Sequence, residues 1–255
     1  MLFIAAALAE ELRVALDLCS ARVEPGYPGV SVWKGSRNGK EIHFLKTGAG
    51  PNRSAVRLER LLACCKPSQI LLAGYAGALD PSLKIGDLVV IRAASSFGEQ
   101  ESALTLEQTP LTGSWELGRS QELFQLGKNA GLRISLGETL TSPHIIGEPG
   151  QKRTLRRRFH ADVIDMETAA LARVSLSRGV PLSCVRAVTD EAADTFLAPF
   201  SYEPGSTLAG RGLRLLAAGS WPSRYGEWKE RAATARESLR QFLTWYLDSS
   251  GPGES

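Results

Sequence analysis

The sequence is poor in the residues that metal centres and disulfide frameworks require. It has four cysteines and three histidines in 255 residues. The cysteines are Cys19, Cys64, Cys65 and Cys184. None of them forms a Cys-x-x-Cys pair, and no cluster of histidines lies near them, so the pattern indicates neither a zinc site nor a disulfide scaffold. The adjacent pair at 64 and 65 lies in a helical pattern and is interpreted as buried thiols, so we expect a cytoplasmic protein without a metal.

Excess charge and long apolar runs are also missing. The formal net charge is only +3, which is too small to indicate nucleic-acid binding. No apolar run is long enough to span a bilayer, so no transmembrane segment is expected. The apolar stretch Met1–Ala9 is short, lacks a basic segment, and is followed at once by Glu10 and Glu11. It therefore predicts a first strand running into a helix and not a signal peptide.

What the chain does have is an ordinary globular composition with alternating elements. Hydrophobic residues make up 43% and charged residues 22% of the sequence. Strands are expected near 2–8, 30–32, 42–45, 69–73, 85–91, 133–140 and 182–188, and helices near 9–19, 52–65, 119–130 and 149–159. Asn38-Gly39 is a good hairpin turn, and the polar stretch 95–120 is expected to be a loop or lid. The alternation predicts an α/β fold: a single-domain, three-layer α/β/α architecture with a central mixed β-sheet.

The tail differs from the rest of the chain. Residues 1–195 are expected to form the α/β domain, and 196–255 a C-terminal extension. Within the extension, 196–226 are rich in Gly, Pro and Ser, and 227–247 predict an amphipathic helix. We interpret this helix as one that packs on the same domain. The alternative is a helix that contacts a membrane surface or a partner, which its Trp, Phe, Leu and Arg content also suits.

The stretch Val163–Ala172 places two acids, Asp165 and Glu167, where a short apolar strand is expected to become a helix within two residues. The buried stripe of that helix is expected to contain Met166, Ala169, Ala170 and Val174. A carboxylate crowded by apolar groups needs a partner. A sugar diol is a suitable partner for Glu167, because a carboxylate accepts hydrogen bonds from two neighbouring hydroxyls. The alternative is that Glu167 only decorates the first helical turn, where the helix dipole favours an acid.

Two further acids follow apolar strands. Asp190 ends the strand near 182–188, and ligands of open α/β sheets bind beyond the carboxyl ends of strands. The alternative for Asp190 is that it caps a following helix at 191–193. Glu11 follows the first strand, and its alternative is a plain acidic first turn of a helix.

The Asp-Met-Glu triplet at 165–167 resembles the signature of the nucleoside phosphorylase/nucleosidase superfamily, and other segments match its motifs in the right order over roughly residues 2 to 195. The resemblance implies a phosphorylase/hydrolase-like fold in which Met166 packs on a ribose and Glu167 holds its hydroxyls. Residues 186–190 are similar to the family's Arg-x-x-[Ser/Thr]-Asp motif. Asp190 would then protonate or hydrogen-bond N7 of the leaving purine, with Thr189 orienting it. Such an acid lowers the barrier, because negative charge builds up on the base as the N-glycosidic bond breaks.

Residues 7–11 resemble the opening motif of the nucleosidases, whose last Glu activates the attacking water. By that register Glu11, and not Glu10, carries the role, and Arg186 helps to hold the same water or an anion. Gly74–Gly77 is similar to the family's Gly-x-Ala-Gly turn under the ribose, which implies substrate contacts for Tyr75, Ala76 and Gly77. Tyr75 stands where nucleosidases often have a Ser.

The remaining motifs indicate which kind of ligand the protein binds. Thr47–Gly50 fits the family's [Ser/Thr]-Gly-x-Gly turn and fits a dinucleotide-binding fingerprint poorly, because Arg53 occupies the position of the third glycine. His144 and Ile145 align with the stretch that binds the base, where His144 would stack on the purine and Ile145 would offer backbone hydrogen bonds. The alternative for His144 is a loop histidine in solvent. The basic run 152–158 is interpreted as a solvated helix face and not as a phosphate site.

Three functions stay open at this point. The first is a purine nucleosidase that hydrolyses a nucleoside, with no cofactor. The second is a phosphorylase that uses inorganic phosphate, which needs several cationic or backbone donors around the nucleophile. The third is a nucleoside-binding protein without activity. Trp221-Pro222 and the Ala-Arg-Glu-Ser-Leu of the final helix resemble the hopanoid-associated phosphorylase-like branch, which acts on an adenosyl group attached to a lipid. Members of the family are usually dimers or larger, so a homodimer is expected.

Overall fold

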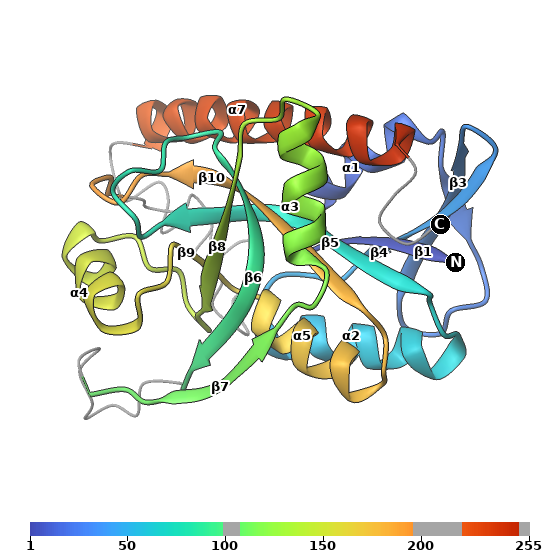
Figure 1. The fold of residues 1–255 in the computed structure, drawn as a ribbon, viewed down its shortest axis with the longest axis horizontal. Helices are drawn as coiled ribbons and strands as arrows, with labels where there is room; N and C mark the ends of the chain where they lie inside the picture. Colours follow the sequence, from blue (N-terminus) through green and yellow to red (C-terminus); the bar gives the residue numbers. More distant parts are fainter. Residues whose placement is uncertain (99–107, 196–220, 250–255) are drawn as a thin grey trace.

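The computed structural model describes residues 1–98, 108–195 and 221–249, with side chains of the last segment described from residue 230 on. The stretch 196–220, which belongs to the segment rich in Gly, Pro and Ser, lies outside the described residues. The described chain forms a ten-stranded mixed sheet with helices on both faces (Figure 1), as the alternation of strands and helices predicts. The strands are β1 (Leu2–Ala6), β2 (Arg22–Glu24), β3 (Ser31–Arg37), β4 (Lys40–Lys46), β5 (Gln69–Ala78), β6 (Leu88–Phe97), β7 (Leu111–Glu116), β8 (Ile134–Thr141), β9 (Val163–Asp165) and β10 (Leu182–Asp190). The helices are α1 (Ala9–Leu18), α2 (Pro51–Cys64), α3 (Ser120–Asn129), α4 (Pro149–Phe159), α5 (Thr168–Ser177) and α7 (Trp221–Asp248).

The strand β5 is the centre of the sheet. It pairs in parallel with β1 on one side and β10 on the other, and β1 continues the sheet to β4. The same strand also pairs antiparallel with β9, through Gly77 opposite Ile164. The pairings β10–β6, β6–β8 and β8–β9 then complete a closed ring of five strands. The sheet is therefore rolled up at one side and open at the other, where β3 and β2 follow β4.

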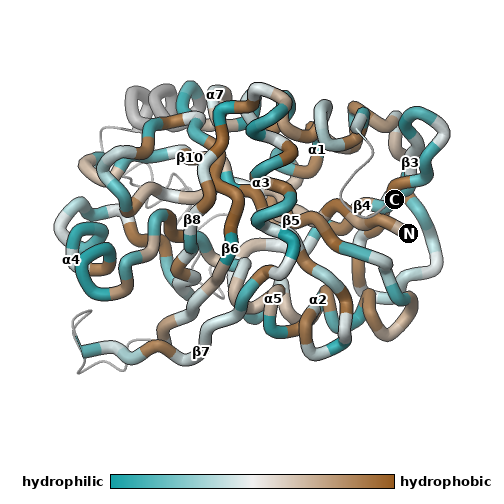
Figure 2. The backbone as a smooth tube through the Cα atoms, viewed as in Figure 1, coloured by the Kyte–Doolittle hydropathy of each residue, from teal (hydrophilic) through white to brown (hydrophobic). Residues whose placement is uncertain are grey.

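Helices cover both faces of this sheet and bury a core on each. The helices α2 and α5 lie on one face, where Leu58 and Leu171 join the strand residues Leu72 and Val188 in an apolar cluster (Figure 1). The helices α1, α3 and α7 lie on the other face and contribute to a second cluster. The hydropathy colouring in Figure 2 shows brown along the central strands and teal over most of α4. Burial of apolar surface between the layers is thus the main stabilising term.

The C-terminal helix packs on the α/β domain. Its fully buried side chains belong to the core cluster that contains α1, and they are Ala235, Leu239, Phe242, Leu243 and Tyr246. The helix begins at Trp221, six residues before the expected 227, and ends at Asp248, whose carboxylate pairs with Arg37. Among the described residues, no helix combines the length and the apolar content needed to cross a membrane. The apolar face of α7 packs against the domain itself.

Of three local predictions that the structure tests, two are wrong and one is confirmed. The expected loop over 95–120 is wrong at both ends, because β6 extends to Phe97 and pairs with β7 at 111–116, while 99–107 lie outside the described residues. The expectation of buried thiols at 64 and 65 is also wrong, because this pair ends α2, where Cys64 is exposed and Cys65 is half-buried. The hairpin at Asn38-Gly39 is confirmed: both residues have positive φ, 51° and 77°, as a two-residue turn between β3 and β4 requires.

The helix after the Asp-Met-Glu triplet starts later than expected. Thr168 is its first residue, so Met166 precedes the helix and is only half-buried. The helix buries Ala169 and Val174 as expected, together with Leu171 and Ala172, whereas Ala170 is half-buried. The delay has a physical cause: Asp165 accepts hydrogen bonds from the backbone N–H groups of residues 167 and 168 and so caps the helix.

Candidate active site

The candidate site lies where several strands end next to the second half of β5. Because β1, β4, β5 and β10 run parallel, the residues that follow them meet at one edge of the sheet. The short strand β9 runs the other way along β5, which turns the chain after Asp165 back toward Gly74. This antiparallel crossing brings the Asp-Met-Glu segment to the same edge as the ends of β1 and β10. Four motifs that are far apart in the sequence thereby share one location.

A buried arginine connects these segments. Arg186 of β10 is 0% exposed, and its Nε donates to Oδ2 of Asp165 over 3.1 Å. Its Nη2 donates to Oγ1 of Thr168 over 2.7 Å and lies 3.8 Å from Oε2 of Glu167. The guanidinium thus fixes the strand-to-helix junction against β10. Sequence reasoning predicted Arg186 as a holder of water or an anion, but these contacts show that its first partners are protein groups.

Asp165 is the anchor of this network, a role that sequence reasoning missed. Its carboxylate also accepts from Oγ1 of Thr139 over 3.0 Å and of Thr141 over 2.8 Å, both on β8. Burial acts to raise the pKa of Asp165, but Arg186 and the hydrogen bonds from Thr168 and Thr141 outweigh it, so the pKa is lowered. The Thr-x-Thr spacing, which points both hydroxyls to one side of a strand, was the available signal.

Glu167 is buried and held by the glycine turn that follows β4. Its Oε1 accepts the backbone N–H of Gly50 over 2.9 Å, across 117 residues of sequence. Gly50 has a φ of 92°, a conformation that favours glycine, so the turn can present this N–H to the carboxylate. Burial raises the pKa of Glu167 to about 7, although the Arg186 guanidinium opposes that shift. The site therefore holds a carboxyl group with acceptor capacity left for a hydroxyl ligand.

Glu11 lies at the first turn of α1 and is only 5% exposed. Its Oε2 accepts the N–H of Leu8 over 2.7 Å, and its Oε1 accepts the N–H of Tyr75 over 2.8 Å. Burial raises the pKa of the Glu11 carboxyl, although Arg186 and these hydrogen bonds oppose the shift. A Cβ on Gly74 would lie 2.8 Å from Oε1 of Glu11 and 2.5 Å from Nη1 of Arg186. Only glycine at 74 lets the two groups approach β5 this closely.

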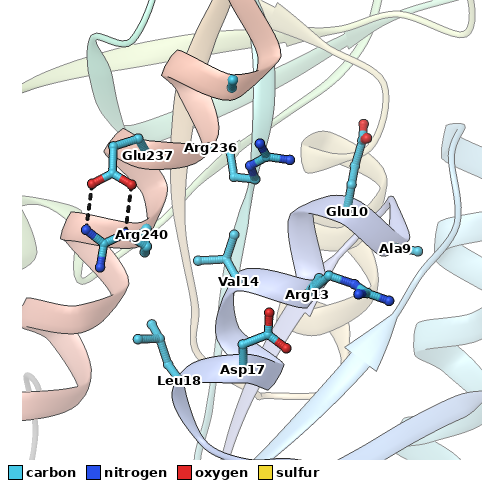
Figure 3. A pocket seen from close by; sticks show the side chains of 10 residues that line it. Ala9, Glu10, Arg13, Val14, Asp17, Leu18, Arg236, Glu237 and Arg240 are labelled. Carbon is cyan, nitrogen blue, oxygen red and sulfur yellow. Dashed lines mark hydrogen bonds and ion pairs between the residues drawn. The ribbon is translucent and has the colours of Figure 1, made fainter. Parts of the chain in front are cut away.

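Glu10 takes a different direction from its neighbour. It lines a groove of about 700 Å³ between α1 and α7, together with Arg13 and Arg236 (Figure 3). The groove contains none of the three acids Glu11, Glu167 and Asp190. Of the two adjacent glutamates, Glu11 therefore faces the sheet edge, in the register that the sequence predicts.

Asp190 is 3% exposed and is the last residue of β10. Thr189 donates its hydroxyl to Oδ1 of Asp190 over 2.9 Å and lies 3.3 Å from the carbonyl oxygen of Ala76. A Cβ on Gly77 would lie 2.8 Å from Oδ2 of the acid, so this glycine makes room for it. No helix follows at 191–193, which removes the alternative that Asp190 serves as a helix cap. Glycines 74 and 77 are three residues apart on β5, so Glu11 and Asp190 approach the strand at points about 10 Å apart.

Lys152 is the residue that the sequence interpretation placed wrongly. The basic run 152–158 was predicted to be a solvated helix face, yet Lys152 is 0% exposed and its Nζ contacts Oδ2 of Asp190. The remaining members follow the prediction more closely, since Arg153 and Arg157 are exposed. The missed signal is helical spacing: Lys152 precedes the buried Leu155 by three residues and therefore shares its face.

The other predicted contact residues lie around this edge with different exposures. The side chain of Tyr75 packs against the apolar cluster beneath α1 and α7, so at the acids this residue offers its backbone N–H. Ala76 is buried. His144 and Ile145 are exposed in the segment between β8 and α4, where the hydroxyl of Ser142 accepts the N–H of His144. The sequence reasoning thus identified the segments at the edge, but not which group each one presents there.

Comparison with known sequences places the chain in a family. Residues 2–214 match the sequence model of the phosphorylase superfamily. The chain belongs to this superfamily. It is 28% identical over 198 residues to the 5′-methylthioadenosine/S-adenosylhomocysteine nucleosidase of Staphylococcus haemolyticus (strain JCSC1435), an alignment that covers 74% of this chain and 86% of the relative.

Solved structures show the same fold. A mutant of the Helicobacter pylori nucleosidase MTAN, with 5′-methylthioadenosine in its active site, superposes with a TM-score of 0.74 at 19% identity and covers 97% of each chain. The futalosine hydrolase of Helicobacter pylori strain 26695 superposes with a TM-score of 0.71 at 20% identity, covering 96% of this chain and 97% of the other. The mixed sheet and its helices are therefore those of the superfamily.

The charges available at the edge limit what this superfamily member can bind there. Within the described ranges, the fully buried cations are Lys152 and Arg186, and each already contacts a carboxylate. The same part of the chain contains no group of three or more His, Cys, Asp and Glu side chains able to hold a metal ion. The described edge consequently offers buried acids and backbone N–H groups, with no buried cation left over for an anionic ligand.

Proposed function

We propose that this protein is an enzyme that hydrolyses the N-glycosidic bond of a purine nucleoside, a 5′-substituted adenosine, and releases the free base. The observation that carries the proposal is a set of three buried acids at one edge of the sheet, Glu11, Glu167 and Asp190. Glu11 and Asp190 approach β5 at two of its glycines, and Glu167 lies 3.8 Å from Arg186, which approaches the same strand. Burying three carboxyl groups is costly unless each has a role or a partner. The nucleosidase name of the Staphylococcus haemolyticus relative supports the same reaction.

The three acids suit the three parts of a nucleoside. Asp190 gives a proton to N7 of the purine while the electrons of the C1′–N9 bond move to the base, which lowers the barrier by general acid catalysis. Glu167 accepts hydrogen bonds from the ribose hydroxyls, and Met166 covers the sugar. Glu11 removes the proton of the water that attacks C1′. The amide donors that fix Glu11 on both oxygens hold it in one orientation, which is the requirement for a general base.

The purine base is expected to contact exposed loop residues. We place the purine beside His144 and Ile145, with Ala76 and Gly77 beneath the nucleoside and Thr189 orienting the acid. The exposure of His144 leaves its ring free to stack on a base. No cofactor enters this reaction, because water is the second substrate.

The pairing of the buried cations with carboxylates favours water over phosphate as the nucleophile. A phosphate dianion requires several cationic or backbone donors that face it. Arg186, the cation nearest to Glu11 and Glu167, already donates to Asp165 and Thr168. A carboxylate such as Glu11 would also repel phosphate while it activates water.

The test is release of adenine from 5′-substituted adenosines, measured by chromatography with and without inorganic phosphate. The proposal predicts release at the same rate in both conditions. Release that depends on phosphate would indicate a phosphorylase, including one that acts on an adenosyl lipid, and binding without release would indicate a nucleoside-binding protein. Either outcome would contradict the proposal.

A matched pair of variants makes the test specific. Glu11→Gln is expected to lower kcat by about 10²–10⁴-fold, the usual contribution of a general base. Glu10→Gln changes the adjacent acid, which lines the groove in Figure 3, and is expected to retain the wild-type rate. Equal losses in the two variants would contradict the assignment of Glu11.

A further inference from the structure

A fully buried lysine contacts the acid assigned to the purine. Lys152 is 0% exposed, and its Nζ donates to Oδ2 of Asp190 and, over 2.7 Å, to the carbonyl oxygen of Glu191. Removing an ammonium and a carboxylate from water is expensive, and replacing such a pair by apolar residues is often neutral or stabilising. The pair is therefore poorly explained as a source of stability alone.

The helix that carries Lys152 is fixed to the rest of the domain. Leu155, one turn further along α4, is 0% exposed in an apolar cluster with Leu79 and Leu140. Arg156 of the same helix pairs with Asp162 over 2.8 Å and with Asp80. The lysine therefore reaches Asp190 from a rigid element, which is how a group that sets the geometry of an acid has to be held.

The two oxygens of Asp190 are held from different elements. Oδ1 accepts the Thr189 hydroxyl from β10, and Oδ2 accepts the Lys152 ammonium from α4. Neither donor comes from the loop over 142–145 that would lie beside the base. The orientation of the carboxyl group is thus set by the protein before any ligand arrives.

We propose that Lys152 is a positioning residue for Asp190, whose positive charge stabilises the carboxylate that forms when Asp190 gives its proton to the purine. This inference rests on the proposed function. As the C1′–N9 bond breaks, its electron pair moves to the purine, the proton of Asp190 moves to N7, and a carboxylate remains. An ammonium group fixed beside that carboxylate stabilises the charge as it develops, in a site where water is largely excluded. The contact between Nζ of Lys152 and Oδ2 of Asp190 places the two groups where this stabilisation requires them.

The experiment combines turnover with binding of an analogue that does not use the acid. Lys152→Met and Lys152→Gln are compared with the wild type and with Arg153→Met, which changes the exposed neighbour on the same helix. Release of adenine gives kcat. Calorimetry gives the Kd of the 7-deaza nucleoside, in which a C–H group replaces N7 and so takes no proton from Asp190.

Removal of the Lys152 charge is expected to lower kcat and to leave the binding of the 7-deaza analogue unchanged. Lys152→Met should lose about 10²–10³-fold in kcat, the range found when one preorganised electrostatic group is removed. Its Kd for the 7-deaza analogue should stay within about threefold of the wild type, and Arg153→Met should match the wild type in both. Lys152→Gln keeps an N–H donor without the charge and should fall as far as Lys152→Met.

Three results would overturn the inference. The first is a wild-type kcat in Lys152→Met, and the second is a wild-type kcat in Lys152→Gln, which would leave only a hydrogen bond and no role for the charge. The third is a parallel loss of kcat and analogue binding, which would indicate a purely structural pair. Failure of the proposed function is distinguishable from all three, because the wild type would then release no adenine from any nucleoside.

Discussion

Single residues at the site are tuned by burial and by one shared cation. The guanidinium of Arg186 lowers the pKa of Asp165 and opposes the upward shifts in the pKa of Glu11 and Glu167. Arg186 lies 3.1 Å from Asp165 and 3.8 Å from Glu167, so its charge acts more strongly on the pKa of Asp165. Glu167 is left with a pKa of about 7, above the ordinary value of 4.5. A group tuned in this way is a site of function more often than a source of stability.

The raised pKa of Glu167 predicts a pH-dependent effect on stability. Between about pH 4.5 and pH 7 the folded protein keeps the proton on Glu167 while the unfolded chain loses it, so the free energy of unfolding falls as pH rises. Glu167→Gln removes this titration. The variant is expected to match the wild type near about pH 4 and to exceed it by about 1–3 kcal/mol near about pH 8, while it loses affinity for nucleosides.

Urea unfolding of the two proteins at both pH values is the measurement. The difference in free energy of unfolding between the two proteins reports on Glu167 alone. Glu11, whose pKa is also raised, is present in both and cancels. A difference that does not change with pH, or a variant that is less stable at high pH, would contradict the role of burial at Glu167.

Sequence patterns located the acids because each follows a strand and carries a short local motif. Asp165, Met166 and Glu167 form one continuous triplet, and Asp190 ends an apolar run. The burial of Lys152 was not predicted, because the strongly basic run around it suggests a helix face in solvent. Its three-residue spacing from the buried Leu155 is the pattern that indicates burial. The partners of Glu167 were also beyond local reasoning, since Gly50 lies 117 residues away. Local motifs therefore predict which acids lie at the edge of the sheet, but not which distant groups hold them.

At the scale of elements, the positions of the buried acids depend more on short strands and turns than on the long helices. The three-residue strand β9 runs against β5 and so reverses the chain at the point where Glu167 is needed. The closed ring of five strands could not be predicted, because it depends on β5 pairing with both β9 and β10. Pairings of this kind join residues that are distant in sequence and leave no local pattern.

The helix α7 is expected to contribute strongly to the stability of the domain. Phe242 is 0% exposed and stacks near Tyr246 in the core on the α1 face of the sheet. Phe242→Ala is expected to lower the free energy of unfolding by about 3–5 kcal/mol, because it removes a large buried ring and leaves a cavity. Arg240→Ala, which removes an exposed pair with Glu237, is expected to change it by less than about 0.5 kcal/mol.

Chemical denaturation of the two α7 variants separates the two interpretations of the tail. A closing helix requires the large loss at Phe242 and the small one at Arg240. If Phe242→Ala were as stable as the control, α7 would not be part of the domain core, and a helix for a membrane surface or a partner would have to be reconsidered.

The whole molecule combines a mixed sheet, two apolar layers and one polar edge. The match to the phosphorylase superfamily extends to residue 214, beyond the 195 residues expected to form the α/β domain. The fold was predictable because strands and helices alternate with clear periodicity along most of the chain. The choice between water and phosphate was not, because it depends on how many cations at the edge remain unpaired once the chain has folded.

Asp190 is proposed to deliver a proton to the departing purine, and replacing this acid with its amide removes that proton alone. Asp190→Asn keeps the shape of the side chain and removes the acid. We expect the variant to stay folded, with a lower free energy of unfolding because the Lys152 ammonium loses its buried carboxylate partner, while its release of adenine falls by at least about 10²-fold. A folded Asp190→Asn variant that releases adenine at the wild-type rate would contradict this role of Asp190.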